Sequence, residues 1–164
     1  MRTAGRLPSS DMEYVVIQSP VGALTLIAAE DALAGIAFGR WMAGRENRTP
    51  VLAQAVRELE EYFNGQRREF TVPLAPKGTA FQKSVWEELR KIPYGETASY
   101  KDIAVRLGKP GAAIAVGQAN SRNPIPIIIP CHRVIGTSGK LVGYTGGIHI
   151  KKTLLAVEGI PYKE

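Results

Sequence analysis

The sequence predicts two domains of different class: an α/β region at residues 12–72 and a mainly helical region at residues 79–164 with a helix-turn-helix. Runs of β-branched and apolar residues come first, and apolar residues at helical spacing dominate afterwards. Between them, Pro73-Leu74-Ala75-Pro76-Lys77-Gly78 discourages regular structure with two prolines and a glycine. We therefore expect a linker at residues 73–78 and a flexible tail at residues 1–11.

The N-terminal region is expected to begin with a meander of strands. Three strands are predicted, at Glu13–Gln18, Leu24–Ala28 and Leu33–Phe38. Turn residues at Ser19–Gly22 and at Glu30-Asp31 separate them. A loop at Gly39–Thr49, a helix at Pro50–Phe63 ended by Asn64-Gly65, and a short strand at Glu69–Val72 complete the domain.

Helices dominate the C-terminal region. The predicted helices lie at Thr79–Lys91, Tyr100–Leu107, Ala112–Asn120 and Ile148–Val157. Thr79 is the expected cap of the first of these helices. The second and third are short and joined by a Gly/Pro turn, which is the pattern of a helix-turn-helix. Ile127-Ile128-Ile129 is expected to be a buried strand that leads to Pro130.

Composition favours a globular protein that binds a polyanion. The chain has 164 residues, 45% of them hydrophobic, and one cysteine, which excludes a disordered chain, an internal disulfide and a cysteine-rich zinc site. No apolar run reaches the ~18 residues of a membrane span, and the N-terminus has no signal-peptide core. Residues 1–76 carry 8 Lys and Arg against 9 Asp and Glu, whereas residues 77–164 carry 13 against 6. This asymmetry indicates nucleic acid, although a merely basic surface fits as well.

The only cysteine, Cys131, lies between an apolar run and two basic residues. A free cysteine behind an apolar run is commonly an inert core residue. A thiol becomes a strong nucleophile as the thiolate, which a neighbouring base or cation favours, and His132 and Arg133 supply one of each. Because successive side chains of an extended segment point to opposite faces, we expect water to relay the proton to His132. Glu158 is the candidate to orient the imidazole, since acidic residues are scarce after Cys131.

Other chemistries fit these residues less well. One cysteine and two histidines, His132 and His149, lack the spacing of a structural zinc site, and we expect neither metal nor cofactor. Pro-Cys-His is not the local signature of a papain-type protease. For His132 taken alone, a structural histidine stays open as the alternative.

The residues around Cys131 resemble those of a known family. Pro130-Cys131-His132-Arg133-Val134, preceded by Asn123-Pro124 and followed by Gly143-Tyr144-Thr145-Gly146-Gly147, is similar to the O6-alkylguanine-DNA alkyltransferases (methylated-DNA–protein-cysteine methyltransferases). Further similar stretches are Phe81–Trp86, Ile92–Thr97, Ser99-Tyr100 and Leu154–Gly159. The resemblance implies an α/β ribonuclease-H-like N-terminal domain and a C-terminal domain with the helix-turn-helix. It also implies minor-groove binding, flipping of the damaged guanine and irreversible transfer of its O6-alkyl group to the cysteine, without a cofactor.

The resemblance also implies roles for individual residues. Cys131 is the nucleophile, His132 deprotonates it through water, Glu158 orients His132, and Tyr100 donates its phenol proton toward guanine N3. Asn123 braces the turn before the cysteine. Substrate-binding residues are Val134, Tyr144, Thr145 and Gly146, and DNA-binding residues are Ala112, Ala113, Ile114, Ala115, Ser121, Arg122 and Arg133. For Tyr100 and Tyr144 taken separately, ordinary core packing is the alternative.

One position departs from the family pattern. The recognition helix of the family begins Ala-Ala-Arg-Ala-Val-Gly, and its arginine enters the base stack, whereas this chain has Ile114 in the arginine's place. Isoleucine can wedge between bases as other apolar residues do, but it cannot hydrogen-bond the orphaned base or neutralise phosphate. We expect weaker duplex binding with the chemistry at Cys131 intact.

The sequence therefore predicts a single-turnover DNA-repair alkyltransferase. Its expected partner is double-stranded DNA containing O6-alkylguanine, with free O6-alkylguanine analogues as further substrates. A non-enzymatic protein that senses alkylguanine and a transcription factor with an incidental cysteine are the alternatives, and the presence of Cys131 counts against the first. We expect a monomer in the prokaryotic cytoplasm, associated with the nucleoid and not with a membrane.

Overall fold

The computed structural model describes residues 11–163, and the chain divides into two compact units after Pro76. This division falls within the segment predicted as a linker. The tail predicted at residues 1–11 lies outside the described residues except for Asp11. The two units are described separately below.

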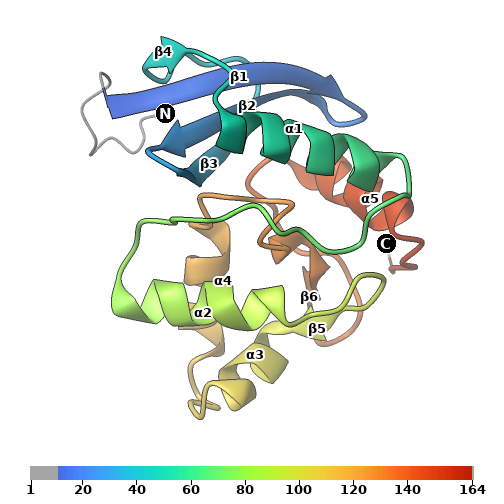
Figure 1. Cartoon of the computed structure of the whole chain (residues 1–164). Helices are drawn as coiled ribbons and strands as arrows, with labels where there is room; N and C mark the ends of the chain where they lie inside the picture. The colour runs from blue at the N-terminus through green and yellow to red at the C-terminus, as the bar shows by residue number, and fades with distance from the viewer. Residues whose placement is uncertain (1–10, 164) are drawn as a thin grey trace. The chain divides into compact units, whose positions relative to one another are not determined.

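The first unit is built on a four-stranded sheet (Figure 1). Its strands are β1 (Met12–Ser19), β2 (Gly22–Ala29), β3 (Ala32–Phe38) and β4 (Arg45–Glu46), in the order β3-β2-β1-β4. β1 and β2 pair antiparallel, as do β2 and β3, which confirms the predicted meander. The short β4 lies within the predicted loop and pairs parallel with β1.

One helix, α1 (Pro50–Phe63), covers the sheet and has the predicted bounds. Thr49 caps it, because its side chain accepts a hydrogen bond from the Leu52 N–H. The strand predicted at Glu69–Val72 is wrong. The Thr71 and Val72 N–H groups donate instead to Oε1 of the buried Glu58 of α1, so a side chain replaces the strand partner that they would need.

Part of the predicted linker is held by the first unit. The Leu33 N–H donates to the Pro73 carbonyl at 2.8 Å, and the Ala75 N–H donates to the Leu33 carbonyl at 2.8 Å. Residues 73–75 therefore extend alongside β3 instead of leaving the unit directly.

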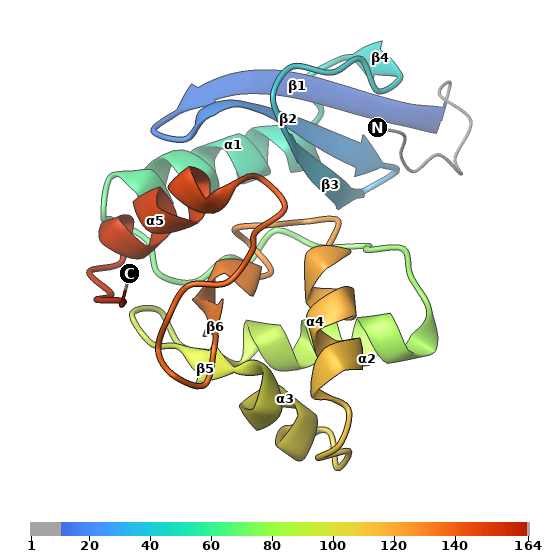
Figure 2. The ribbon, with the colours of Figure 1, turned by 180° about the vertical axis from the view of Figure 1, so that it is seen from behind.

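The second unit contains the remaining helices and two short strands. Its elements are α2 (Ala80–Arg90), β5 (Ala98–Ser99), α3 (Tyr100–Arg106), α4 (Ala113–Ser121), the 3-10 helix η2 (Cys131–Arg133), β6 (Val134–Ile135) and α5 (Ile148–Val157). The four predicted helices are confirmed to within two residues. α4 packs against α2 and α3 (Figure 2). Gly108, with a φ of 73°, ends α3 and opens the turn of the helix-turn-helix.

The strand predicted at Ile127-Ile128-Ile129 is wrong. Residues 127 and 128 form a turn, and Pro126 and Ile129 are joined by an isolated bridge. Ile127 has a φ of 76°, which is an unusual conformation for a β-branched residue. All three isoleucines are buried, so the apolar run reflects burial of a turn, not of a strand.

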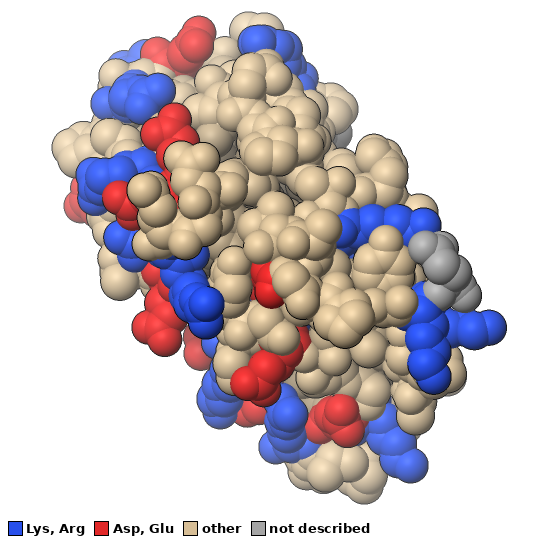
Figure 3. Space-filling view, turned by 90° about the vertical axis from the view of Figure 1, so that its right-hand side faces the viewer, with Lys and Arg blue, Asp and Glu red and all other residues tan. Residues whose placement is uncertain are grey.

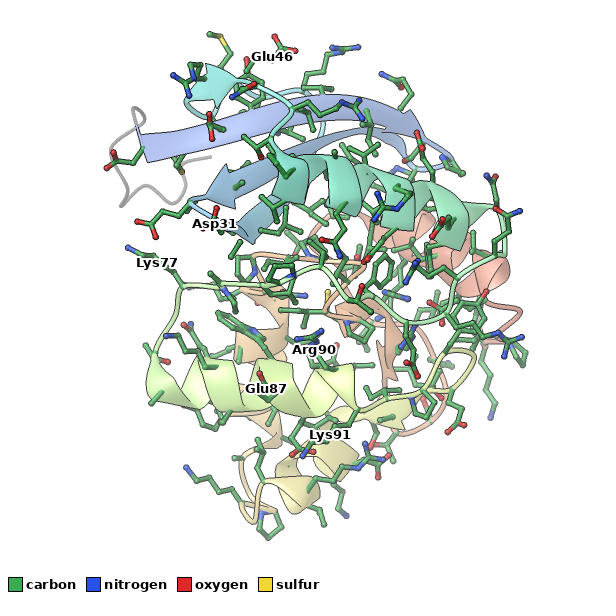
Figure 4. The ribbon with its side chains drawn as sticks, in the orientation of Figure 1. Asp31, Glu46, Lys77, Glu87, Arg90 and Lys91 are labelled. Carbon is green, nitrogen blue, oxygen red and sulfur yellow. The ribbon has the colours of Figure 1, made fainter. Side chains whose placement is uncertain are left out.

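The surface carries both signs of charge. In Figure 3, Lys and Arg lie beside Asp and Glu at several places on the face shown. Arg90 and Lys91 lie at the C-terminal end of α2 (Figure 4), where positive charge complements the helix dipole. No helix among the described residues is long and apolar enough to cross a membrane.

Trp86 joins α2 to α4. Its ring is buried, and its indole N–H donates to the Ala119 carbonyl at 2.9 Å. The close fit extends to Gly78, where a Cβ would come within 2.5 Å of the ring. The buried ring of Trp86 packs between α2 and α4, and its indole N–H is hydrogen-bonded to α4. Trp86 therefore holds α4 in position against α2.

Replacing Trp86 by phenylalanine should destabilise the second unit by about 2 kcal/mol, because it removes a buried hydrogen bond and leaves a small cavity. Urea unfolding followed by circular dichroism measures the loss. The matched control is Trp41→Phe, since that indole also donates to a backbone carbonyl, at Phe38, but its side chain is 43% exposed. Equal losses in the two variants would contradict the anchoring role of Trp86.

Candidate active site

Cys131 follows a turn that is braced by Asn123. The Asn123 Nδ2 group donates to the Ile129 carbonyl at 2.8 Å, and its Oδ1 accepts from the Ile125 N–H at 2.9 Å. The Cys131 N–H donates to the same Ile129 carbonyl at 2.7 Å. One amide side chain therefore connects both ends of the turn that delivers the cysteine.

The segment around Cys131 is not extended, in contrast to the sequence-based expectation. Cys131–Arg133 form one turn of 3-10 helix, closed by the Arg133 N–H donating to the Pro130 carbonyl at 3.0 Å. Successive side chains on such a turn point about 120° apart. The side chains of His132 and Cys131 therefore point in different directions, as predicted, but because of the 3-10 turn and not because the segment is extended.

The carboxylate of Glu158 is the centre of a buried polar network. It lies 2.7 Å from His132 Nε2 and accepts from Arg133 Nε at 2.8 Å, from Arg133 Nη2 at 3.0 Å and from the Gly95 N–H at 3.1 Å. Arg133 Nη1 donates to the Ile92 carbonyl at 2.7 Å. All of these side chains are buried. The two-pronged Arg133–Glu158 pair fixes the carboxylate, which in turn holds the imidazole.

The network sets the protonation state of His132. Burial lowers the pKa of His132, with the charges of Arg133 and Lys151 acting in the same direction and Glu158 opposing them. The imidazole is therefore neutral at neutral pH, and its Nε2–H donates to the Glu158 carboxylate. Nδ1 then carries the lone pair, and this buried atom has no partner among the described residues. Nδ1 of His132 can therefore accept a proton.

The thiol of Cys131 is buried and surrounded by groups that oppose the effect of burial. Burial raises its pKa, whereas the side chains of Asn123 and Tyr144 and the charge of Lys151 lower it. The pKa of Tyr100 is raised by burial and by the negative charge of the Cys131 thiolate. The phenol of Tyr100 therefore interacts electrostatically with the Cys131 sulfur, and it keeps its proton at neutral pH.

The predicted substrate-binding residues lie after the cysteine turn. Val134 is fully buried in β6, and its carbonyl already accepts one hydrogen bond, from Lys151 Nζ at 2.8 Å. Tyr144 and Gly146 are half-buried, whereas Thr145 is exposed. The Thr145 hydroxyl donates to the Ser121 carbonyl at 2.9 Å, so this loop is joined to the end of α4.

The N-terminal end of α4 presents small residues and one large apolar side chain. Ile114 is 81% exposed, and Ala112, Ala113 and Ala115 are half-buried beside it. Gly117 lies against Tyr100, since a Cβ at Gly117 would meet the phenol ring at 3.6 Å. The exposed isoleucine and the phenol therefore belong to the same end of the site.

The other residues predicted to contact DNA differ in their exposure. Ser121 and Arg122 are exposed at the end of α4. Arg133 is only 5% exposed, and its guanidinium is occupied by Glu158 and the Ile92 carbonyl. The prediction that Arg133 binds DNA does not fit this position, because a buried guanidinium that is already paired does not face the solvent.

Sequence reasoning missed two polar residues of the site. Asn120 donates from Nδ2 to the Cys131 carbonyl at 3.5 Å. Lys151 is fully buried on α5. The signal for Lys151 was available, because it lies at helical spacing from Leu154, Leu155 and Glu158, on the face of α5 that must be buried. Among the described residues, no three His, Cys, Asp or Glu side chains are grouped as metal ligands.

Both units match known domain families. Residues 12–76 match the 6-O-methylguanine DNA methyltransferase, ribonuclease-like domain, and residues 80–160 match the 6-O-methylguanine DNA methyltransferase, DNA binding domain. The ribonuclease-like class predicted for the first unit and the DNA-binding class predicted for the second are confirmed.

Complete relatives match over nearly their whole length. The methylated-DNA–protein-cysteine methyltransferase of Methanosarcina acetivorans is 47% identical over 90% of this chain and 99% of its own. The constitutive methylated-DNA–protein-cysteine methyltransferase of Bacillus subtilis is 45% identical over 92% of this chain and 98% of its own. The crystal structure of Mycobacterium tuberculosis OGT in complex with DNA is 48% identical, with a TM-score of 0.83 over 89% of this chain and 92% of that one.

The fold, the Pro-Cys-His-Arg turn and these relatives lead to one conclusion: the chain belongs to the family of methylated-DNA–protein-cysteine methyltransferases.

Proposed function

We propose that the chain repairs double-stranded DNA by moving the alkyl group of O6-alkylguanine onto Cys131, once per protein molecule. The observation that carries this proposal is the buried arrangement of Cys131, a neutral His132 and the Glu158 carboxylate. A thiol used only for packing needs no base, whereas a thiol that attacks carbon must first lose its proton. The relatives' names and the DNA complex of the Mycobacterium tuberculosis protein support the same activity.

Deprotonation is assigned to His132 acting through water. Its Nδ1 is the free acceptor of the ring, because Nε2–H is directed at Glu158. The 3-10 turn directs the imidazole away from the sulfur, so one water molecule between them completes the path. Glu158 stabilises the imidazolium that forms, as the carboxylate of a nucleophile–base–carboxylate triad does.

The transfer itself is a displacement at the alkyl carbon. The thiolate forms the S–C bond while the C–O6 bond breaks and guanine leaves with the electron pair. Tyr100 donates its phenol proton to guanine N3, which makes the purine a better leaving group. The thiol proton ends on His132, and Tyr100 is left as the phenolate. The imidazolium and the phenolate balance, so the reaction creates no net charge, and the protein keeps a stable thioether.

The buried position of Cys131 requires the damaged base to leave the duplex. A stacked guanine cannot bring its O6-alkyl group to a thiol that is 5% exposed. Flipping the base out of the duplex costs a few kcal/mol of free energy, which contacts between the protein and the base must offset. Several groups are assigned to bind the flipped base: the main chain at Cys131 and Val134, the Thr145 N–H, and the side chain of Tyr144 beside Gly146. Asn123 holds the turn before the cysteine. Free O6-alkylguanine analogues reach the same site without this cost.

The recognition helix is assigned to the minor groove, with Ala112, Ala113 and Ala115 permitting close approach and Ser121 and Arg122 at its far end. The exposed Ile114 would wedge into the vacated base stack. It supplies neither charge nor hydrogen bond, so duplex binding is weaker than with arginine at this position. We further propose that the chain acts as a monomer on the prokaryotic nucleoid in the cytoplasm.

Incubating the protein with O6-methylguanine duplex DNA should add the mass of one methyl group, mapped to Cys131 by peptide mass spectrometry. The increment should stop at one per molecule with excess substrate, because the thioether does not turn over. Cys131→Ser should show no adduct. DNA binding without a mass gain would instead indicate a non-enzymatic sensor of alkylguanine.

Glu158→Gln should slow alkylation of Cys131 by about tenfold or more, because the imidazolium loses its counter-charge. It should also cost about 3–5 kcal/mol of stability, since the buried guanidinium of Arg133 loses its counter-charge. The matched control is Glu58→Gln, which alters another buried glutamate, in the first unit. An alkylation rate lowered equally by both changes would show general destabilisation instead of a role for Glu158 at His132.

Ile114→Arg should tighten binding to alkylated duplex DNA by about tenfold at fixed salt, through a phosphate or orphan-base contact. Fluorescence anisotropy with a labelled duplex measures the change. The control is Val105→Arg, which adds the same charge at an apolar position of α3 that is 54% exposed. An equal gain from both variants would reduce the effect to net charge, and no gain from Ile114→Arg would refute the prediction.

A further inference from the structure

We propose that Asn120 holds the water molecule that carries the proton from Cys131 to His132, and that it is therefore a positioning residue of the alkyl transfer. This inference rests on the function proposed above, which places one water between the sulfur and the imidazole but assigns no group to orient it. Asn120 is polar and only 6% exposed, and the proposed transfer gives it no role. A relay water must present a hydrogen to the imidazole and a lone pair to the thiol at the same time, so it gains from a third, fixed contact.

The side-chain amide of Asn120 lies against the cysteine turn. Asn120 belongs to the last turn of α4, and its Nδ2 donates to the Cys131 carbonyl at 3.5 Å, which is a long contact. Its Oδ1 is buried and has no hydrogen-bond partner among the described residues. A buried amide oxygen without a donor costs stability, so we expect a donor there that the polypeptide does not supply.

A second buried acceptor belongs to the same turn. His132 Nδ1 carries the lone pair of the imidazole, because Nε2–H is directed at Glu158, and it too lacks a partner in the part of the chain that the structure describes. Nδ1 is the ring nitrogen nearer the backbone, so it stays close to the main chain of the turn whose carbonyl Asn120 contacts. Two buried acceptors beside one thiol call for a partner with two donors.

Water fits this pattern of acceptors. It has two O–H donors, one for Asn120 Oδ1 and one for His132 Nδ1, and a lone pair that accepts from the thiol of Cys131. Three polar partners are typical of a buried water molecule. The two acceptors also set its orientation, because with one hydrogen on Asn120 and the other on His132, the lone pairs are left for the S–H group.

The proton transfer balances in this arrangement. The thiol proton passes to the water oxygen while the water passes its other hydrogen to His132 Nδ1, so the S–H bond breaks, an N–H bond forms and the water stays neutral. The sulfur becomes a thiolate and the ring an imidazolium. The water then accepts from Nδ1–H and donates to the thiolate. The hydrogen bonded to Asn120 Oδ1 does not move, so Asn120 holds the water before and after the transfer.

An apolar residue in place of Asn120 changes none of the charges at the site. The titratable and polar groups that act on the sulfur are Asn123, Tyr144, Lys151 and Tyr100, and those that act on the imidazole are Glu158, Arg133 and Lys151. These groups are the same in wild type and in a variant at Asn120, so their titrations cancel when the two alkylation rates are compared at each pH.

A crystal structure that resolves ordered water tests the geometry directly. One water should lie within hydrogen-bond distance of Asn120 Oδ1, His132 Nδ1 and Cys131 Sγ. It should be missing in Asn120→Leu, because leucine has no polar side-chain atom to hold it. A water that contacts His132 Nδ1 but not Asn120 would overturn the proposal, whether or not the protein transfers alkyl groups.

The rate at which O6-benzylguanine alkylates Cys131 gives a second readout, without a contribution from duplex binding. Asn120→Leu should be about tenfold or more below wild type at pH 7. The difference should shrink as the pH rises toward the pKa of the thiol, because hydroxide then removes the proton without the relay. A rate lowered by one factor at every pH would show a packing role, and weaker binding of O6-benzylguanine at an unchanged pH profile would show a contact with guanine. Either result overturns the relay role.

Two further variants control for position and chemistry. Asn120→Ser, which keeps an oxygen acceptor, should recover part of the lost rate. Gln118→Leu removes an exposed amide from the same helix and should match wild type at every pH. Should Asn120→Leu not fold by circular dichroism, Asn120→Met replaces it as the apolar variant.

Failure of the proposed transfer would look different. A protein whose crystal structure shows the water on all three groups, but which forms no adduct on Cys131, supports the role of Asn120 in holding the water and refutes the transfer. A protein that forms the adduct at equal rates in wild type and Asn120→Leu refutes the role of Asn120 alone.

Discussion

The carboxylate of Glu158 is the constraint on which the rest of the second unit depends. It ends α5, accepts from the backbone of the Pro-Tyr-Gly turn after α2, and binds both His132 and Arg133 of the cysteine turn. Three segments far apart in sequence therefore meet at one charge. A buried carboxylate is tolerated only when its hydrogen-bonding capacity is filled, so the network requires all of its members. The guanidinium of Arg133 stabilises the buried negative charge of Glu158, which explains why this basic residue points inward.

The helix-turn-helix and the thiol are connected by packing instead of by charge. Trp86 holds α4 to α2, and Tyr100, the first residue of α3, rests on Gly117 of α4. A Cβ at Gly117 would lie 3.6 Å from the phenol ring, in ordinary van der Waals contact with it. The helix assigned to the DNA, α4, thus packs directly against the phenol assigned to the guanine. A base that leaves the duplex beside α4 would meet Tyr100 directly.

Local signals were sufficient for most of the helices and insufficient where a distant side chain decides the structure. α1 has its predicted bounds because Thr49 caps it, its apolar residues have helical spacing, and Asn64-Gly65 follows it. α5 has no side-chain cap and lies between Gly147 and Gly159. The wrong predictions at 69–72 and 127–129 have different causes. At 71–72 the carboxylate of Glu58 takes the place of a neighbouring strand, whereas at 127–129 the apolar residues are buried in a turn. At the site, the scarcity of acidic residues points to Glu158, whereas the inward position of Arg133 depends on partners that the sequence does not reveal.

The position of Glu158 after Cys131 in the sequence also affects the order in which the site forms during synthesis. Cys131 leaves the ribosome well before α5, and until Glu158 follows it, neither His132 nor Arg133 has the carboxylate that fixes it. A nascent chain that has not yet reached Glu158 thus carries the cysteine turn without the carboxylate that holds its side chains. The helix α5 therefore completes the network, and His132 and Arg133 are fixed only after α5 has been synthesised and has packed against the turn.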